Sequence, residues 1–202
     1  MGLPGESIMP HHPVKKKIVR RPSADGQIGH LGELPPLLQR IYSARQLTSE
    51  EELDRTLAKL PSPWLLQGME AMTEHLADAI RQQRHLLIVA DFDADGATSC
   101  AVGLLGLRQM GAARVSYLVP NRFEYGYGLT PEIVAVAASQ SPDVLITVDN
   151  GIASIEGVSA AKDLGMRVLI TDHHLPGAEL PQADAIDLLD HRIFDHQPRG
   201  PR

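Results

Sequence analysis

The sequence is poor in cysteine, in aromatic residues and in long apolar runs. Cys100 is its one cysteine, so no disulfide can form within the chain, and we expect this thiol to pack as a small core residue. No run approaches the roughly 18 consecutive apolar residues of a membrane-spanning helix, and the N-terminus lacks the pattern of a secretory signal. We therefore expect a cytoplasmic protein without a membrane partner.

An excess of positive charge and a glycine-rich phosphate loop are also missing. The formal net charge is -6 at pH 7, which argues against binding nucleic acid by bulk electrostatics. A nuclease is not excluded, because carboxylates that collect divalent cations add to this negative count. No Gly-x-Gly-x-x-Gly or Gly-x4-Gly-Lys-Ser/Thr sequence follows the first apolar strand-like run, so a generic nucleotide-binding domain lacks support.

Composition and spacing divide the sequence into four segments. Residues 1–30 hold clustered lysines and arginines with little apolar periodicity, which predicts a flexible basic tail. These charges could contact a phosphate backbone, but exposure to solvent is the simpler interpretation. Residues 31–80 predict a helical lead-in, with a helix start at Thr48–Glu51 before Leu53, Leu57 and Leu60. Residues 81–186 hold the main domain, and residues 187–202 predict a disordered tail.

Short apolar runs alternate with helical stretches through the main domain. Such βα repeats predict an α/β fold with a mainly parallel sheet flanked by helices. The predicted strands are 85–90, 115–119, 144–148 and 168–171, with a fifth starting in 183–186, and the predicted helices are 69–80, 98–110, 131–139 and 155–164.

Acidic residues and histidines follow three of the predicted strands. Ligands bind beyond the carboxyl ends of parallel strands, so we expect these side chains at one edge of the sheet. One aspartate there is most simply a helix N-cap, but many carboxylates repel one another unless cations join them. The first strand is followed by Asp91, Asp93 and Asp95, the third by Asp149 and Asn150, and the fourth by Asp172, His173 and His174.

This ligand set favours Mn²⁺ or Mg²⁺ over a structural zinc, because oxygen donors outnumber imidazoles. Two ions that share a carboxylate would lie about 3.5–4 Å apart, activate water and stabilise the oxygens around phosphorus. Asp93 and Asp95, two apart in a predicted tight loop, can face different ions. Gly96 allows close backbone approach, and a helix starting near Ala97 would direct its amides at phosphate. The pattern predicts a hydrolytic phosphoesterase.

Three motifs, in this order, resemble those of the DHH phosphoesterase superfamily. They are Asp91-Phe-Asp-Ala-Asp-Gly-Ala-Thr-Ser99, Val148-Asp-Asn-Gly-Ile152 and Thr171-Asp-His-His-Leu-Pro176. A fourth segment, Pro120-Asn-Arg-Phe-Glu-x-Gly-Tyr-Gly-Leu129, is similar to the RecJ-like single-stranded-DNA-specific exonucleases. The resemblance extends from about Leu34 to Ile186, and the combination is more specific than any one motif.

The resemblance implies a 5′-to-3′ exonuclease that acts on single-stranded DNA with Mn²⁺ or Mg²⁺ and serves recombination and repair. It also implies a single-strand-binding protein and a helicase as further partners. The implied metal ligands are Asp91, Asp93, Asp95, Asp149 as the bridge, His173 on the second ion, and His174 on metal or the scissile phosphate. Asp172 would orient a histidine from behind. The implied substrate contacts are Thr98, Asn121, Arg122 and Asn150, although a surface salt bridge is an equally good interpretation of Arg122.

The sequence departs from this family at two places. Tyr125 stands where RecJ-like chains usually carry an acidic residue, and from Asp187 onward the sequence no longer matches. The fourth motif, which supplies a further metal-binding aspartate, and the DNA-binding domains of the family are not within these 202 residues. We expect weaker binding of the second ion and reduced or absent processive digestion. The pairs Asp190-His191 and Asp195-His196 predict no metal site, because their five-residue spacing suits neither a helix nor a strand face.

Two other functions stay open at this point. A DHH phosphoesterase could act on a small phosphoester or pyrophosphate, which the RecJ-like segment at Asn121–Leu129 disfavours. A DHH-fold binding module without catalysis is disfavoured by the intact Asp93, Asp95, Asp149 and His173, and favoured by the missing fourth motif.

Overall fold

The computed structural model describes residues 31–45, 47, 49–54, 56–60 and 62–188. The chain divides into two compact units, Met1–Leu60 and Pro61–Arg202, which are described separately below. The predicted basic tail at 1–30 lies outside the described residues, as does most of the predicted C-terminal tail.

The described part of the first unit holds one α-helix and two 3₁₀ helices. They are α1 (Pro36–Ser43), η1 (Glu50–Leu53) and η2 (Leu57–Lys59). The predicted helix through Leu53, Leu57 and Leu60 is therefore wrong. Leu57 and Leu60 are 84% and 68% exposed, so no tertiary packing offsets the cost of nucleating an α-helix.

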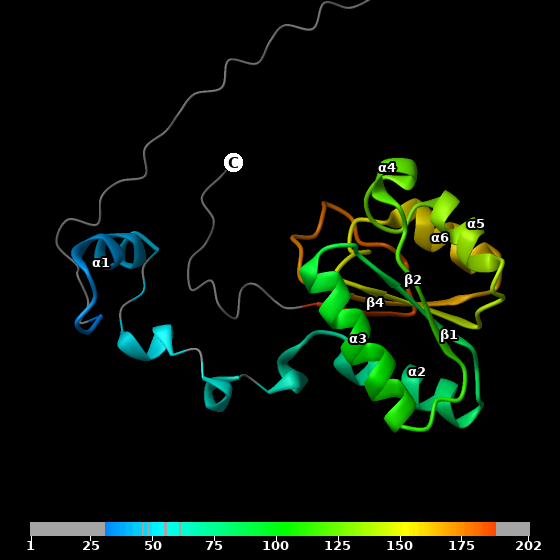
Figure 1. Ribbon diagram of the computed structural model, residues 1–202, viewed down its shortest axis with the longest axis horizontal. Coiled ribbons are helices and arrows are strands. Elements are labelled where there is room, and N and C mark those ends of the chain that lie inside the picture. Colours follow the sequence, from blue (N-terminus) through cyan, green and yellow to red (C-terminus); the bar gives the residue numbers. More distant parts are fainter. Residues whose placement is uncertain (1–30, 46, 48, 55, 61, 189–202) are drawn as a thin grey trace, which may run out of the picture. The chain divides into compact units, whose positions relative to one another are not determined.

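The second unit is built on a five-stranded parallel sheet with the strand order β2-β1-β3-β4-β5 (Figure 1). Each of the five apolar runs that predicted a strand contributes residues to a strand, and the predicted α/β fold with a mainly parallel sheet is confirmed. The strands are β1 (Leu86–Ala90), β2 (Val115–Leu118), β3 (Val144–Val148), β4 (Arg167–Asp172) and β5 (Ala185–Leu188).

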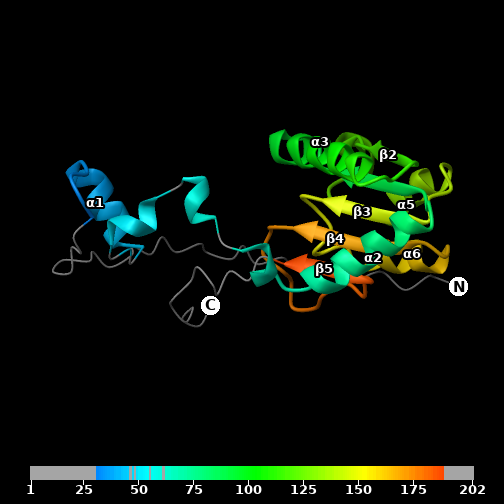
Figure 2. The same cartoon turned by 90° about the horizontal axis from the view of Figure 1, so that it is seen from below.

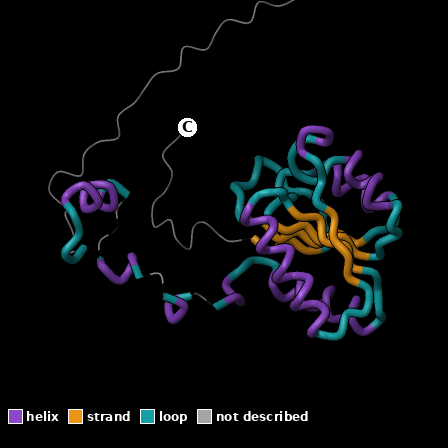
Figure 3. Tube along the Cα trace, viewed as in Figure 1, coloured by secondary structure: helices purple, strands orange, loops and turns teal. Residues whose placement is uncertain are grey.

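Helices cover both faces of the sheet, as Figures 2 and 3 show. The period-two alternation of β1 divides its side chains between two cores: Leu86 and Ile88 face one side, and Leu87 and Val89 face the other. Cys100 is buried in the first of these cores, as expected, and its burial raises the pKa of the thiol. The first core lies under α2 (Met69–Arg81) and α3 (Ala94–Gln109), and the second under α5 (Pro131–Ala138) and α6 (Ile155–Asp163).

The described part of this unit also contains two short helices, η3 (Pro63–Leu65) and α4 (Arg122–Tyr125). Helix α2, which the sequence placed in the lead-in at 31–80, packs against β5 and contributes Met72 and Ala79 to the core of the sheet. The division of the chain into the four segments stays a prediction. Among the described residues, no helix has the length and apolar character needed to cross a bilayer.

The strand order places β1 between β2 and β3 in the sheet, although β2 lies between β1 and β3 in the sequence. The connection from β1 to β2 and the connection that starts at β3 therefore leave in opposite directions, and a crevice opens between the carboxyl ends of β1 and β3. The aspartates that follow these two strands lie at this crevice.

Asp143 joins three strands at the opposite, amino edge of the sheet. Its carboxylate accepts a 2.7 Å hydrogen bond from the His85 amide and lies 3.2 Å from the Arg84 guanidinium, and its carbonyl accepts from the Arg167 amide. The hydrogen bond from the His85 amide is the main reason that the pKa of Asp143 is held below its ordinary value, with Arg84 adding to the effect.

We predict that Asp143→Ala lowers the free energy of unfolding by about 1 kcal/mol at neutral pH, because the amide at the start of β1 loses a charged acceptor that is itself partly exposed. A carboxyl whose folded-state pKa is depressed stabilises the fold above its unfolded-state pKa of about 4 and loses that contribution as pH falls through the lower folded-state value. Urea denaturation at several pH values measures both effects. The exposed Asp163→Ala variant is the control, and an equal loss in both variants would contradict the prediction.

Candidate metal centre

The loop after β1 places two carboxylates at the crevice. Helix α3 begins at Ala94, earlier than the predicted start near Ala97, because the Asp93 side chain caps it by accepting hydrogen bonds from the amides of Asp95 and Gly96. The predicted tight loop at Asp93–Asp95 is therefore wrong, since Asp95 lies in the first turn of a helix. Asp91 is nearly buried and accepts a hydrogen bond from the Phe92 amide.

Gly96 is required by the close approach of this helix to the strand. A Cβ added to Gly96 would collide with the main-chain carbonyl oxygen of Asp91. The first turn of α3 can therefore lie against the end of β1 only if no side chain is present at this position.

The end of β3 contributes Asp149, whose carboxyl side chain is 5% exposed. Its backbone has a φ of +63°, which is sparsely populated for residues other than glycine, and its amide donates to the carbonyl of Thr171. The next residue, Asn150, is buried, and its Nδ2 donates to the carbonyls of Val89 and Val148. Asn150 thus holds the ends of β1 and β3 together.

The end of β4 contributes Asp172 and the two histidines. The Asp172 carboxylate accepts hydrogen bonds from the amides of Ile152 and His174 and lies 2.7 Å from His174 Nδ1. A carboxylate can only accept, so Nδ1 carries the proton in this contact and Nε2 of the neutral ring keeps its lone pair for a ligand. The contact with Asp172 is also the main cause that raises the pKa of His174.

Two sets of possible ligand atoms meet at this edge, and Asp149 belongs to both. Within each set all the ligand atoms lie within 4.8 Å of one another. Asp149 Oδ1 lies 2.9 Å from His173 Nε2, and among the described residues Asp149 alone joins the carboxylates after β1 to the imidazoles after β4. The first set is Asp91, Asp93 and Asp149, and the second is Asp149, His173 and His174.

Asp95 belongs to neither set, although the sequence proposed it as a ligand. Its side chain is exposed, and it lines an open cleft of about 410 Å³ together with Thr98, Asp149 and His173. The Thr98 hydroxyl donates to the carbonyl of Ala94 within its own helix. The roles proposed for Asp95 and Thr98 stay predictions.

The electrostatics of the centre favour bound cations. Burial is the largest influence on Asp149 and raises its pKa; the nearby His173 lowers this pKa, and the neighbouring Asp93 carboxylate raises it. The pKa of Asp93 is lowered, chiefly by the hydrogen bond from the Gly96 amide. In addition, Asp149 Oδ1 and Asn150 Oδ1 are buried, and among the described residues the nearest partner of Asp149 Oδ1 is His173 Nε2, at 2.9 Å. A buried carboxylate oxygen that faces further carboxylates and imidazoles suits a divalent cation.

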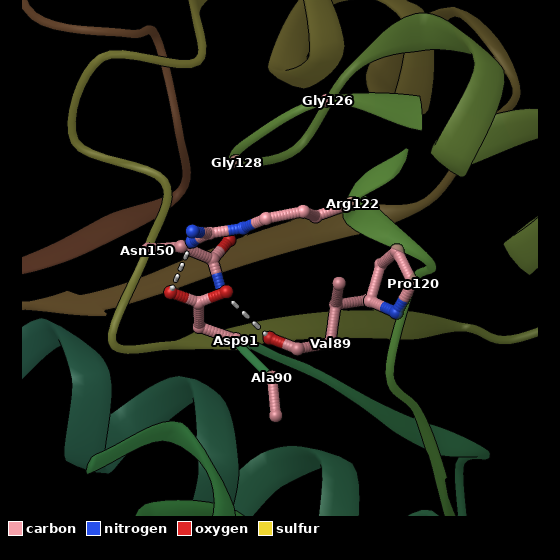
Figure 4. Close-up of a pocket in the computed structure, with 8 residues that line it drawn as sticks. All are labelled: Val89, Ala90, Asp91, Pro120, Arg122, Gly126, Gly128 and Asn150. Carbon is pink, nitrogen blue, oxygen red and sulfur yellow. Dashed lines mark hydrogen bonds and ion pairs between the residues drawn. The ribbon is translucent and has the colours of Figure 1, made fainter. Parts of the chain in front are cut away.

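Arg122 extends across a narrow pocket beside the centre, where its guanidinium reaches the carboxylate of Asp91 (Figure 4). The nitrogen-to-oxygen distance is 3.6 Å, and the guanidinium carbon lies 3.8 Å from the centroid of the Phe92 ring. Asn121, the other proposed substrate contact of this loop, caps α4 by accepting from the Phe123 amide. Arg122 therefore brings positive charge close to the centre. The hydrogen bond that caps α4 is enough to explain an asparagine at position 121.

Tyr127 is a residue of this centre that the sequence analysis did not single out. Its hydroxyl donates to the carbonyl of Asp149 at 3.3 Å and lies 3.3 Å from both ring nitrogens of His174. Partial burial, and after it the surrounding carboxylates, raise the pKa of Tyr127 to about 12. The sequence signal that could have identified Tyr127 is its position between two glycines, Gly126 and Gly128. In the structure both glycines have a positive φ.

Comparison with known proteins supports the resemblance seen in the motifs. A family model described as "DHH family, N-terminal domain" matches residues 85–192, more than half of the chain. The single-stranded-DNA-specific exonuclease RecJ of Salmonella typhimurium is 47% identical over 173 residues, which are 85% of this chain and 30% of that protein. The protein of the same name from Haemophilus influenzae is 48% identical over 171 residues, which are 85% of this chain and 29% of that protein.

A solved structure gives the same result for the fold. The crystal structure of an exonuclease RecJ bound to manganese is similar with a TM-score of 0.58 and 34% identity, over 66% of this chain and 33% of that one. The chain spans about 30% of the length of the curated relatives that it matches.

We predict that Gly96→Ala lowers the free energy of unfolding by about 1–3 kcal/mol, because the new methyl group must displace the Asp91 main chain. Gly106→Ala in the same helix is the matched control. A Cβ there meets its nearest atom, the end of the Met110 side chain, at 4.0 Å, so alanine should stabilise the helix by up to about 1 kcal/mol. Urea denaturation measures both, and equal effects would show that Gly96 is not needed for close packing.

Proposed function

This chain belongs to the DHH family, and we propose that its metal centre hydrolyses phosphodiester bonds with Mn²⁺ or Mg²⁺, as a 5′-to-3′ exonuclease on single-stranded DNA. The observation that carries the proposal is the position of Asp149, which belongs to both sets of ligand atoms. A carboxylate shared in this way is what a site for two neighbouring cations requires.

The residues of each set are proposed to hold one cation. Asp91 and Asp93 would hold one ion, His173 and His174 the other, and Asp149 would bridge them. Divalent cations in such a site supply Lewis-acid activation of water and of the phosphoryl oxygens.

The remaining residues prepare the site. Asp172 fixes the ring of His174 from behind, and the Tyr127 hydroxyl lies against the same ring, so the imidazole is held on two sides. Arg122 lies 3.6 Å from Asp91 with its guanidinium partly exposed, where a phosphate could accept hydrogen bonds from it.

The substrate and its setting are proposed from the relatives. The matched RecJ proteins are named as single-stranded-DNA-specific exonucleases, and a RecJ structure is described as bound to manganese. We propose the same substrate and metal class for this chain, with a role in DNA recombination and repair in the cytoplasm. A single-strand-binding protein and a helicase as further partners rest on the family resemblance.

We predict that Asp149→Ala weakens the binding of both Mn²⁺ ions, because the shared carboxylate is lost. The loss should at least equal the roughly 10- to 100-fold typical of removing an outer-shell partner. Isothermal titration with Mn²⁺ measures affinity and stoichiometry. Asp163→Asn, which removes an exposed carboxylate of α6, should bind as the unchanged chain does. Unaltered Mn²⁺ binding by Asp149→Ala would refute the shared-ligand assignment.

We predict that the 202-residue chain releases mononucleotides from a 5′-phosphorylated single-stranded DNA only when Mn²⁺ or Mg²⁺ is present, slowly and without processivity. End-labelled DNA resolved on a denaturing gel measures the products, with Asp149→Ala as the inactive comparison. Full processive digestion by this chain would contradict the expected impairment. Equal cleavage by both proteins, or none by either, would count against catalysis at this centre.

A further inference from the structure

Phenylalanine is scarce in this protein, and its placement is uneven. The sequence has three, of which Phe92 and Phe123 lie in the described part of the chain. Neither belongs to the two hydrophobic cores, and they are 47% and 96% exposed. Phe92 lies in the loop directly after Asp91, and Phe123 lies in the short helix α4 directly after Arg122.

Folding does not bury the Phe123 side chain, so a hydrophobic contribution to stability does not explain a phenylalanine at this position. Its amide donates to the Asn121 side chain, which fixes the start of α4, while the ring stays almost completely in solvent. Exposed large apolar side chains are individually common. A phenyl ring that is 96% exposed and directly follows the arginine whose guanidinium reaches Asp91 is a more specific arrangement.

Arg122 connects the Phe92 ring to the centre. Its guanidinium lies over the face of Phe92 at 3.8 Å, is 5.6 Å from the Tyr127 ring centroid, and pairs with Asp91. A guanidinium over the face of an aromatic ring combines a planar cation with a π-surface, and aromatic and guanidinium planes are the surfaces on which unpaired nucleobases stack.

We propose that Phe123, together with the Arg122–Phe92 pair, forms a platform on which a base of single-stranded DNA stacks beside the metal centre. The inference rests on the proposed function and extends it, because it names the part of the substrate that this edge recognises. The platform reads no base identity, since every nucleobase has a π-face. It selects unpaired bases, because the faces of bases within a duplex are covered by their neighbours.

The test compares two ligands of equal charge. The affinity of the 202-residue chain is measured by fluorescence anisotropy for a 12-residue oligothymidylate and for a 12-residue abasic oligomer with the same phosphates. Ca²⁺ replaces Mn²⁺, and a gel checks that the oligomers stay intact. We expect the unchanged chain to prefer the oligothymidylate, and Phe123→Ala to lower that affinity about tenfold while leaving the affinity for the abasic oligomer unaltered.

Three matched variants separate stacking from other effects. Phe123→Tyr keeps a ring and should bind as the unchanged chain does, whereas Phe123→Leu keeps apolar area without a π-face and should behave as Phe123→Ala does. Trp64→Ala removes an exposed ring elsewhere in the same unit and should change neither affinity. Circular dichroism checks that each variant is folded.

The proposal is overturned if the unchanged chain binds the two oligomers equally or binds neither, if Phe123→Ala weakens both alike, or if Phe123→Leu matches the unchanged chain. These results are distinct from failure of the proposed function, which the mononucleotide-release assay decides. Metal-dependent cleavage by a chain that does not prefer the oligothymidylate would disprove the stacking platform and leave the proposed function standing. A preference for bases without metal-dependent cleavage would remove the catalytic proposal and leave the platform.

Discussion

Strands β1 and β3 pair in parallel register from Leu86 opposite Val144 to Ala90 opposite Val148. This pairing delivers Asp91 and Asp149 to the same edge of the sheet, at the point where the chain connections diverge. Like charges brought so close repel strongly, more so when one carboxyl group is almost completely buried. We interpret the contacts around Asp91 and Asp149 as the features that allow the folded chain to keep these two carboxylates close together.

The backbone around the centre is specialised for close approach. Gly96 lets the first turn of α3 lie against the carbonyl of Asp91, and Asp149 adopts a positive φ of 63° at the end of β3. Asn150 ties the ends of β1 and β3 together through two main-chain carbonyls. Strained or sterically demanding positions gather here because the ligand atoms must converge within a few ångströms, and rigid strand ends hold them there.

The centre has two sides of different character. On one side, the cleft of about 410 Å³ is lined by polar residues of α3 and of the loops after β3 and β4, among them Thr98 and His173. On the other side, Arg122 lies over the Phe92 ring, is 5.6 Å from the Tyr127 ring centroid and reaches Asp91. A polar cleft and a cationic aromatic edge on either side of clustered carboxylates suit a substrate with both phosphates and flat bases, which agrees with the nucleic-acid substrate proposed above.

The local sequence determined the strands and most helices of the second unit, because continuous apolar runs must be buried between two helical layers and the amphipathic stretches must cover them. It also determined that Asp91, Asp149 and His173 would share one edge, since parallel strands end at the same edge. Tertiary structure alone decided the rest. The contact of Tyr127 with His174 joins residues that are 47 apart in the sequence. Asp95 lies in a helical turn outside both ligand sets. Leu57 and Leu60 stay exposed, so no packing against a core stabilises an α-helix there. Each of these depends on which surfaces meet in space, a property that local composition and periodicity do not encode.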